Sequence, residues 1–446
     1  MNKNFLEDII KKLKKKGASE SDAIYFESES VSASCRLGKI EKTERSEIKE
    51  IGIRTIINNR QSIVSTTNLE SDNIDYLIEQ AFDMAKIVPE DKFCGLASEE
   101  QLHNYDLSEF EKLNLFDNTE IEANLLIDNV QKLENSALEN KKIINSEGAE
   151  IASTKNKFCL LGTNGLSQEF SKSHSDYIVA VLAGDSNSME REYDYKSKVF
   201  YNDLGDFEQI GKNVAEKAIK KLDSRKIKTC RTGVIFDSRV SSSLLSNLFN
   251  ACNSSRVIRG TSFLKNKIGN NLFKKNINIL DNPTMKRRLR SRVADCEGIK
   301  CSKRSLVKNG ELTFFFNSLS SARELKNLPT GHASRGVSSL PSPSYTNLYL
   351  ENGDQSIKQL IKSVGDGLLV TELMGTSINY SNGDYSRGAS GFWIGNGDIQ
   401  FPVSEITIAG NLNNMFGSLI PANDLEFNYS VNAPSCLVEN MMVGGV

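Results

Sequence analysis

Three histidines are the only imidazoles that this 446-residue chain can offer to a metal ion or to a proton transfer. They are His103, His174 and His332, which lie far apart in the sequence, and none is followed by glutamate. Zinc peptidases hold at least two imidazoles close together, usually on one helix, with a glutamate beside them as the general base. The sequence therefore predicts neither a metal ligand nor a catalytic residue of that kind in this chain.

The eight cysteines are scattered along the sequence, and only Cys296 and Cys301 lie close together. Their spacing differs from that of the usual zinc motifs, and no histidine is near them. For a chain of this composition we expect reduced thiols that are mostly buried in the core.

His332 lies in the loop LPTGHASRG (328–336), where flanking glycine and serine residues could leave a base exposed. An independent hydrolase that uses His332 with a serine or a cysteine is therefore an alternative, although no G-x-S-x-G elbow precedes a helix. The basic cluster at 286–292 could contact phosphates, but Asp295 and Glu297 follow it closely. We expect this cluster to be solvated or ion-paired, and the net charge of −2 gives no general attraction to nucleic acid.

Several elements must position these residues, and the chain is too long for a single ordinary core. Hydrophobic residues make up 39% and charged residues 25%, as in folded proteins. We predict an α+β fold with three domains. An N-terminal domain (1–95) and a central domain (96–228) mix antiparallel strands with flanking helices, and a turn-rich antiparallel β domain with few helices follows (229–446).

Hydrophobic periodicity locates the main helices, and turn residues locate the hairpins. Asn58-Asn59 and Asn396-Gly397 are turn candidates between apolar alternations, and Gly388 and Gly391 suggest close approach of another backbone or a ligand. The acidic, tyrosine-bearing stretch 188–198 is expected to be a loop. The predicted helices cover residues 1–17, 72–87, 119–136, 207–222 and 239–252.

The longest apolar run, Tyr177 to Ala183, is far shorter than the roughly 20 residues of a membrane-spanning helix. The first 17 residues form an amphipathic pattern with acidic residues inside it, unlike a secretion signal. We therefore expect a cytoplasmic protein with no membrane association.

Six long strings, in order along the chain, resemble the TldD/PmbA metallopeptidase family, and specifically its PmbA (TldE) branch. The resemblance continues more weakly through the first 228 residues. The strings are RGTSFLKNKIG (259–269), LPTGHASRG (328–336), LPSPSYTNLYLENG (340–353), GDGLLVTELMG (365–375), NGDYSRGASGFWIGNGDIQFPVSEITIAGNL (382–412) and PANDLEFNYSVNAPSCLVENMMVGG (421–445).

This resemblance implies a cytoplasmic, zinc-dependent peptidase built as a heterodimer, in which a TldD-like subunit carries an HExxxH motif. In this chain the equivalent helix contains SLLSNLFNACNSS (243–255). Ser246 and Asn247 fall where the first His-Glu pair would be, and Asn250 or Ala251 falls near the second histidine. Cys436 lies outside the segment of the family's ligand cysteine. The resemblance thus implies a subunit with no cofactor of its own, with zinc in the TldD-like partner.

A partner role follows from this reading. Related subunits often enclose their working site between them, and strand edges bind extended peptides through backbone hydrogen bonds. The expected partners are the TldD-like subunit and an unfolded or extended peptide, and the candidate contacts are His332, Tyr385, Arg387 and Trp393. The family's older label, "modulator of DNA gyrase", leaves a second alternative, a regulatory protein that acts on that enzyme.

Overall fold

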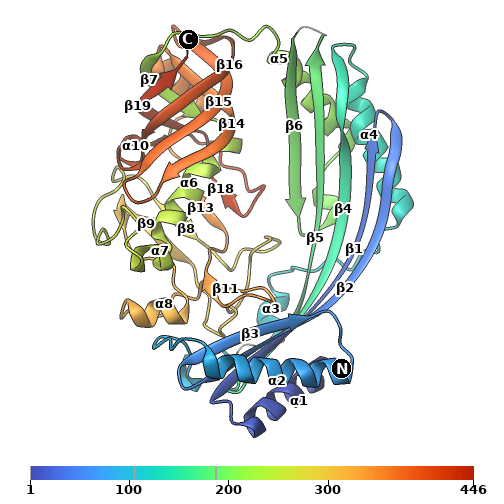
Figure 1. The fold of residues 1–446 in the computed structure, drawn as a ribbon. Helices are drawn as coiled ribbons and strands as arrows, with labels where there is room; N and C mark the ends of the chain where they lie inside the picture. The colour runs from blue at the N-terminus through green and yellow to red at the C-terminus, as the bar shows by residue number, and fades with distance from the viewer. Residues whose placement is uncertain (1, 105, 186–187, 446) are drawn as a thin grey trace.

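The structure is a computed structural model that describes residues 2–104, 106–185 and 188–445 (Figure 1). Residues 2–220 form helices α1 (Asn2–Lys16), α2 (Ser71–Ile87), α3 (Leu107–Glu111), α4 (Ala123–Leu138) and α5 (Phe207–Lys220), with strands β1 (Glu20–Arg36), β2 (Lys39–Ile57), β3 (Arg60–Thr66), β4 (Ile143–Gly162), β5 (Ser167–Gly184) and β6 (Met189–Lys198).

The remaining helices are α6 (Ser238–Cys252), α7 (Ser254–Ile258), α8 (Leu319–Glu324), α9 (Ile357–Val364) and α10 (Leu412–Ser418). The strands of this part are β7 (Cys230–Phe236), β8 (Ile279–Asp281), β9 (Arg304–Lys308), β10 (Glu311–Leu312), β11 (Ala333–Ser334), β12 (Ser342–Pro343), β13 (Leu348–Leu350), β14 (Gly367–Asn379), β15 (Asp384–Gly395), β16 (Asp398–Asn411), β17 (Ile420–Pro421), β18 (Val431–Asn432) and β19 (Cys436–Gly444).

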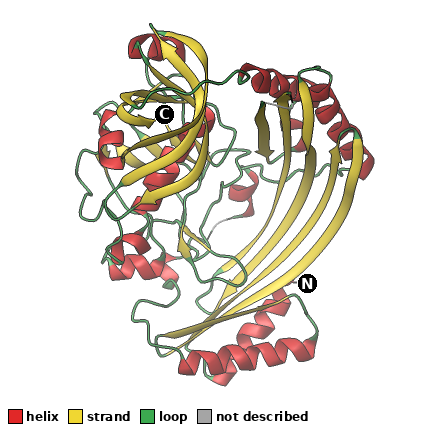
Figure 2. Cartoon of the chain, turned by 45° about the horizontal axis from the view of Figure 1, so that its top comes forward, coloured by secondary structure: helices red, strands yellow, loops and turns green. Residues whose placement is uncertain are grey.

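The first sheet is built from long antiparallel strands in the order β3-β2-β1-β4-β5-β6. Its strands curve together, with helices packed near both ends (Figure 2). At one end α1 and α2 bury Leu6, Ile9 and Ile78 against the strands. At the other end α4 and α5 bury Leu126 and Val214 in a separate cluster. The long strands therefore tie two small cores into one sheet, through the β1–β4 pair.

Five strands between residues 230 and 444 close a ring, whereas β8, β9, β10, β13 and β18 form a separate sheet. β14, β15 and β16 are antiparallel neighbours, β16 also pairs with β19, and β19 pairs with β7, which pairs in parallel with β14. Helix α6 packs its apolar side, including Leu244 and Leu248, into the core of this ring. The antiparallel strands that the sequence predicts for this part are confirmed, and β7–β14 is the one parallel pair in the ring among the described strands.

Both predicted turns are present. Asn58 and Asn59 have φ of 49° and 61° between β2 and β3, and Asn396 and Gly397 have φ of 53° and 79° between β15 and β16. Positive φ at both central residues matches the twist of a tight hairpin, which explains the choice of Asn and Gly. The close approach of another backbone predicted at Gly391 is confirmed. A Cβ at this position would lie 1.9 Å from the carbonyl oxygen of Leu369.

One local prediction was wrong. The stretch expected to be a loop (188–198) contains the edge strand β6, which pairs with β5 from Ser175 to Gly184. Its charged side chains concealed the strand, because they form ion pairs and hydrogen bonds with distant residues and leave no clear apolar alternation. Charged residues are common on edge strands, where they discourage further pairing.

The α+β class and its antiparallel sheets are confirmed. The predicted domain boundaries at residues 95 and 228 stay predictions, and the first sheet runs across the first of them. Within the described residues, no helix combines the length and the hydrophobicity that crossing a membrane requires. The eight cysteines are free thiols, and five of them are buried.

Candidate functional site

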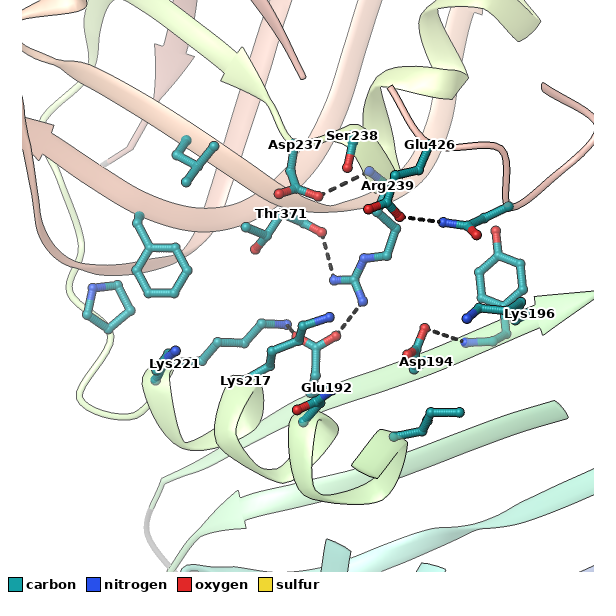
Figure 3. A pocket seen from close by; sticks show the side chains of 18 of the residues that line it. Glu192, Asp194, Lys196, Lys217, Lys221, Asp237, Ser238, Arg239, Thr371 and Glu426 are labelled. Atoms are coloured by element: carbon teal, nitrogen blue, oxygen red, sulfur yellow. Dashed lines mark hydrogen bonds and ion pairs between the residues drawn. The ribbon is translucent and has the colours of Figure 1, made fainter. Parts of the chain in front are cut away.

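A cavity of about 910 Å³ lies between the first sheet and the ring, and we call it the inter-sheet cavity. Strand β6 and helix α5 form one wall, and the start of α6 with β14–β16 forms the other (Figure 3). Charges of both signs line it. The charged lining residues are Glu192, Asp194, Lys196, Lys217, Lys220, Lys221, Asp237, Arg239 and Glu426.

Four of the charged side chains around this cavity form a network that joins its two walls. Glu192 of β6 accepts hydrogen bonds from Arg239 of α6 at 2.6 Å and from Lys221 at 2.8 Å. Lys221 also donates to Glu372 of β14 at 2.9 Å. Arg239 also donates hydrogen bonds to the backbone carbonyl oxygens of Tyr193 and Thr371, at 2.8 and 3.0 Å.

This network determines the charge states at the cavity wall. Burial opposes ionisation of Glu192, but the nearby charges of Arg239 and Lys221 outweigh it and lower the pKa of that carboxyl. Asp237 caps α6 by accepting a hydrogen bond from the backbone N–H of Arg239. Burial is the larger effect at Asp237 and raises the pKa of its carboxyl. The network is thus a charge-matched clamp between the sheet and the ring.

A second recess, which we call the α6 groove, has a volume of about 590 Å³ and shares Tyr195 and Arg239 with the inter-sheet cavity. Helix α6 forms its floor and β14 with Arg387 of β15 forms its side. Its lining residues are Tyr193, Tyr195, Arg239, Val240, Ser242, Ser243, Ser246, Asn247, Asn250, Leu373, Thr376, Ile378, Tyr380 and Arg387.

The structure places the four helix residues that the resemblance aligned with the family's zinc motif. Ser246, Asn247 and Asn250 line the groove, whereas Ala251 is buried in the core. Hydroxyl and amide groups cannot replace the imidazoles of a zinc site. Within the part of the chain that the structure describes, no three His, Cys, Asp or Glu side chains are grouped to hold a metal. The residues of this groove therefore do not fit zinc.

A third recess of about 680 Å³, which we call the Arg256 pocket, adjoins the α6 groove and shares Thr376, Ile378 and Tyr380 with it. It is lined by Arg256, Arg259, Thr261, Thr376, Ser377, Ile378, Asn379, Tyr380 and Ser381. The guanidinium of Arg256 lies over the Tyr380 ring, 4.5 Å from its centroid. Neither this pocket nor the α6 groove has an Asp or Glu among its lining residues.

The four residues predicted as peptide or partner contacts occupy different places. Arg387 lines the α6 groove, where its Nε donates to the carbonyl oxygen of Gly375 at 2.7 Å. Tyr385 and Trp393 lie on the same strand, but Tyr385 is buried in the core and Trp393 is half-buried against it. None of the three recesses is lined by His332, Tyr385 or Trp393. Their role as contacts stays a prediction.

His332 is buried beside Asp281, with Nε2 3.0 Å from a carboxylate oxygen. The rings of Phe314 and Phe316 pack on its imidazole, at centroid distances of 5.6 and 4.9 Å. Its Nδ1 has no hydrogen-bond partner among residues 2–104, 106–185 and 188–445, so no serine or cysteine of these ranges is poised against it. This environment is that of a structural histidine and does not favour an independent hydrolase.

The predicted basic cluster at 286–292 is largely occupied by internal contacts. Arg287 pairs with Asp203 at 3.2 Å, and Arg288 and Arg290 stack on Phe427 and Tyr345. Arg292 is buried and donates to the carbonyl oxygen of Ala333. These contacts do not favour a phosphate-binding surface at this cluster.

Sequence reasoning missed the clamp residues Glu192, Lys221 and Arg239. The available signal was weak: charged residues in the tyrosine-bearing stretch 188–198, and an arginine two residues after the helix-capping Asp237. Nothing in the spacing of these residues along the chain indicates that they meet.

Comparison with known proteins places the chain in a family. Three family models match in succession: PmbA/TldA metallopeptidase domain 1 (residues 21–85), the central domain (103–222) and the C-terminal domain (229–445). The metalloprotease PmbA of Escherichia coli O157:H7 is 31% identical over 93% of this chain and 90% of that protein. A PmbA homologue of Haemophilus influenzae is 30% identical over 97% and 93%.

Solved structures agree with this assignment. A Bacteroides thetaiotaomicron protein described as a candidate modulator of DNA gyrase has a TM-score of 0.91 at 25% identity, covering 100% of this chain and 99% of its own. TldE from Thermococcus kodakarensis has the same fold, with a TM-score of 0.87 at 22% identity, covering 99% and 100%. The consecutive family models and the nearly full-length relatives establish that this chain belongs to the PmbA/TldD metallopeptidase family.

Proposed function

We propose that this chain is the non-catalytic, PmbA/TldE-like subunit of a cytoplasmic TldD–TldE-type zinc peptidase that acts on unfolded or extended peptides. Its partner is a TldD-like subunit that carries HExxxH and the zinc ion. Related subunits can share a fold and an interface while only one of them keeps the chemistry.

The face of α6 in the α6 groove is the observation that carries this proposal. A metallopeptidase requires imidazole and carboxylate groups there, and this chain has Ser246, Asn247 and Asn250 instead. Their side chains are engaged in the helix and its surroundings: Ser246 and Asn250 donate to backbone carbonyl oxygens one turn back. The Asn247 side-chain oxygen accepts from the Tyr380 hydroxyl at 2.9 Å. The groove keeps its shape without a metal ligand.

Strand β14 supports a role in holding peptide. Its pairing with β7 ends at Val370. The strand itself continues to Asn379 and stays paired with β15 along its other edge. Leu373, Thr376 and Ile378 of this stretch line the α6 groove. An extended peptide could add a strand at such an edge through backbone hydrogen bonds, which do not depend on its sequence.

The test is metal analysis and peptide cleavage with and without the partner. The chain purified alone is expected to contain no stoichiometric zinc and to cleave no unfolded substrate. Co-purified with a TldD-like subunit from the same organism, it should give cleavage that a chelator abolishes. A partner variant with its HExxxH histidines replaced by alanine is the control. Stoichiometric zinc, or chelator-resistant cleavage, in the isolated chain would contradict the proposal.

A further inference from the structure

We propose that the α6 groove and the Arg256 pocket together bind the carboxylate groups of an extended peptide, so that acidic peptide segments are the preferred ligands of this chain. This inference rests on the proposed function in one respect, the assumption that the chain handles peptides. In the structure, arginines without a carboxylate among the lining residues lie beside the edge of β14 that no longer pairs with β7.

Three arginines carry the charge. Arg256 stacks on Tyr380, Arg259 donates from Nε to the carbonyl oxygen of Ser255 at 3.1 Å, and Arg387 donates from Nε to Gly375. Among the described residues, none of the three guanidinium groups has an ion pair with a carboxylate. The linings of the two recesses likewise contain no acidic residue. The chain has a net charge of −2, so this is a local excess of positive charge.

The arginines are suited to recognise carboxylates. Each guanidinium has several N–H groups in a planar fork, and the contacts just described use few of them. Such forks bind carboxylates with two parallel hydrogen bonds, which are stronger than those between neutral groups. Three tyrosines line the α6 groove beside these arginines, and their rings can pack on an extended chain: Tyr193, Tyr195 and Tyr380.

A buried polar group also indicates a ligand. Asn247 lines the α6 groove and is only 5% exposed, and its side-chain Nδ2 has no hydrogen-bond partner in the described part of the chain. An unsatisfied buried donor costs free energy, and a carbonyl or carboxylate oxygen in the groove would remove that cost. The side-chain oxygen of Asn247 accepts the hydrogen bond from the Tyr380 hydroxyl. This contact orients the amide and leaves Nδ2 as the group available to a ligand.

A peptide fits these features better than a nucleic acid does. The arginines are next to the stretch of β14 beyond Val370, which pairs with β15 along one edge and no longer with β7 along the other. A peptide supplies both a backbone for that second edge and carboxylates for the guanidinium groups. Nucleic acids are held by runs of positive charge along a backbone of phosphates. Three arginines in two small recesses of a chain with a slight negative charge do not provide such a run.

The experiment measures binding of labelled peptides to the isolated, full-length chain by fluorescence anisotropy, so it requires neither zinc nor the partner. One unstructured peptide carries several glutamates, and its matched control carries glutamine at the same positions. Both are made with a free and with an amidated C-terminus, which separates side-chain carboxylates from the terminal one. A single-stranded oligonucleotide of similar charge is the third ligand.

The glutamate peptide is expected to bind about tenfold more tightly than the glutamine peptide, a ratio typical of one charge-assisted hydrogen bond. The double variant Arg259→Gln, Arg387→Gln should abolish that preference. Arg225→Gln should preserve it, because Arg225 stacks on Phe401, which lines neither recess. Circular dichroism of each variant confirms that it is folded.

Three outcomes would overturn the inference: equal affinity for the two peptides, a preference that survives in the double variant, or binding of the oligonucleotide alone. Loss of peptide binding on addition of the TldD-like subunit would assign the surface to the subunit interface and would also overturn it. Failure of the proposed function has a different signature, because it leaves the binding assay intact and removes only the partner-dependent, chelator-sensitive cleavage.

Discussion

The inter-sheet cavity and the α6 groove share Arg239 and differ in how their positive charges are balanced. In the cavity, Arg239 and Lys221 meet the buried carboxylate of Glu192, which is only 2% exposed. In the groove and the adjoining Arg256 pocket, Arg256, Arg259 and Arg387 form no ion pair with a carboxylate of the described residues. Both linings contain arginines, but carboxylates accompany them in the inter-sheet cavity and are absent from the linings of the α6 groove and the Arg256 pocket.

This difference separates a structural use of arginine from a binding use. A buried ion pair fixes two elements in one geometry, and removal of one partner leaves a charge in a poorly solvated place. An exposed arginine without an acidic partner contributes little to folding and leaves its hydrogen-bonding groups for a ligand. The cavity clamp should therefore affect stability, and the groove arginines should affect binding.

The largest expected effect is on the clamp. Arg239→Ala leaves Glu192 buried without its closest partner, and a broken buried pair costs about 3–5 kcal/mol. We expect the free energy of unfolding, measured by urea denaturation, to fall by an amount in that range. The matched control is Arg191→Ala on β6, the strand that carries Glu192. Arg191 pairs with Glu147 at the surface, and such an exposed pair contributes about 0–1 kcal/mol. Equal losses in the two variants would remove the distinction between the recesses.

The pH dependence of stability tests the same pair. The folded state lowers the pKa of Glu192 below its ordinary value of 4.5, so its pairing stabilises the fold above that pH. The contribution is lost as pH falls through 4.5 and then through the lower pKa of the folded state. The stability advantage of the native chain over Glu192→Gln should therefore be constant near neutral pH and shrink in acid. An advantage that grows in acid would show that the carboxyl is protonated in the fold.

Much of the architecture was predictable because local patterns decide it. Asn58-Asn59 and Asn396-Gly397 each form the expected hairpin, since few residue pairs tolerate two positive φ angles. Helix α6 was predicted within one residue of its observed start, because the apolar spacing of Val240, Leu244 and Leu248 defines its buried face. Of the helix residues that the resemblance aligned with the zinc motif, Ser246, Asn247 and Asn250 line a recess and Ala251 lies in the core, and the alignment itself stays a prediction.

The charged features could not be predicted, because their meaning depends on partners distant in sequence. Glu192 and Arg239 meet only after β6 has joined the first sheet and α6 has packed into the ring. The same composition made β6 look like a loop. What groups Arg256, Arg259 and Arg387 is that none of them has an ion pair among the described residues. The order of residue types along a chain does not show which charged groups will lack a partner after folding.

Salt should separate the two recesses further. Raising ionic strength from about 0.1 M to about 1 M shortens the Debye length from about 10 Å to about 3 Å. The dissociation constant of the glutamate peptide should rise several-fold over this range, because its carboxylates meet exposed guanidinium groups. The destabilisation caused by Arg239→Ala should stay nearly the same, since the pair is shielded from solvent. A salt-independent peptide affinity would contradict charge recognition in the groove.

The smallest expected effect is the most specific test of the comparison. Arg259 is exposed and forms no ion pair with any residue that the structure describes, so Arg259→Gln should change the free energy of unfolding by no more than about 0.5 kcal/mol. The same substitution should weaken the glutamate peptide while leaving the glutamine peptide unaffected, because only the charged ligand uses the guanidinium. A substitution that is silent in folding and selective for one ligand is what distinguishes a binding residue from a structural one. Destabilisation on the scale of Arg239→Ala would instead show that the groove arginines belong to the fold.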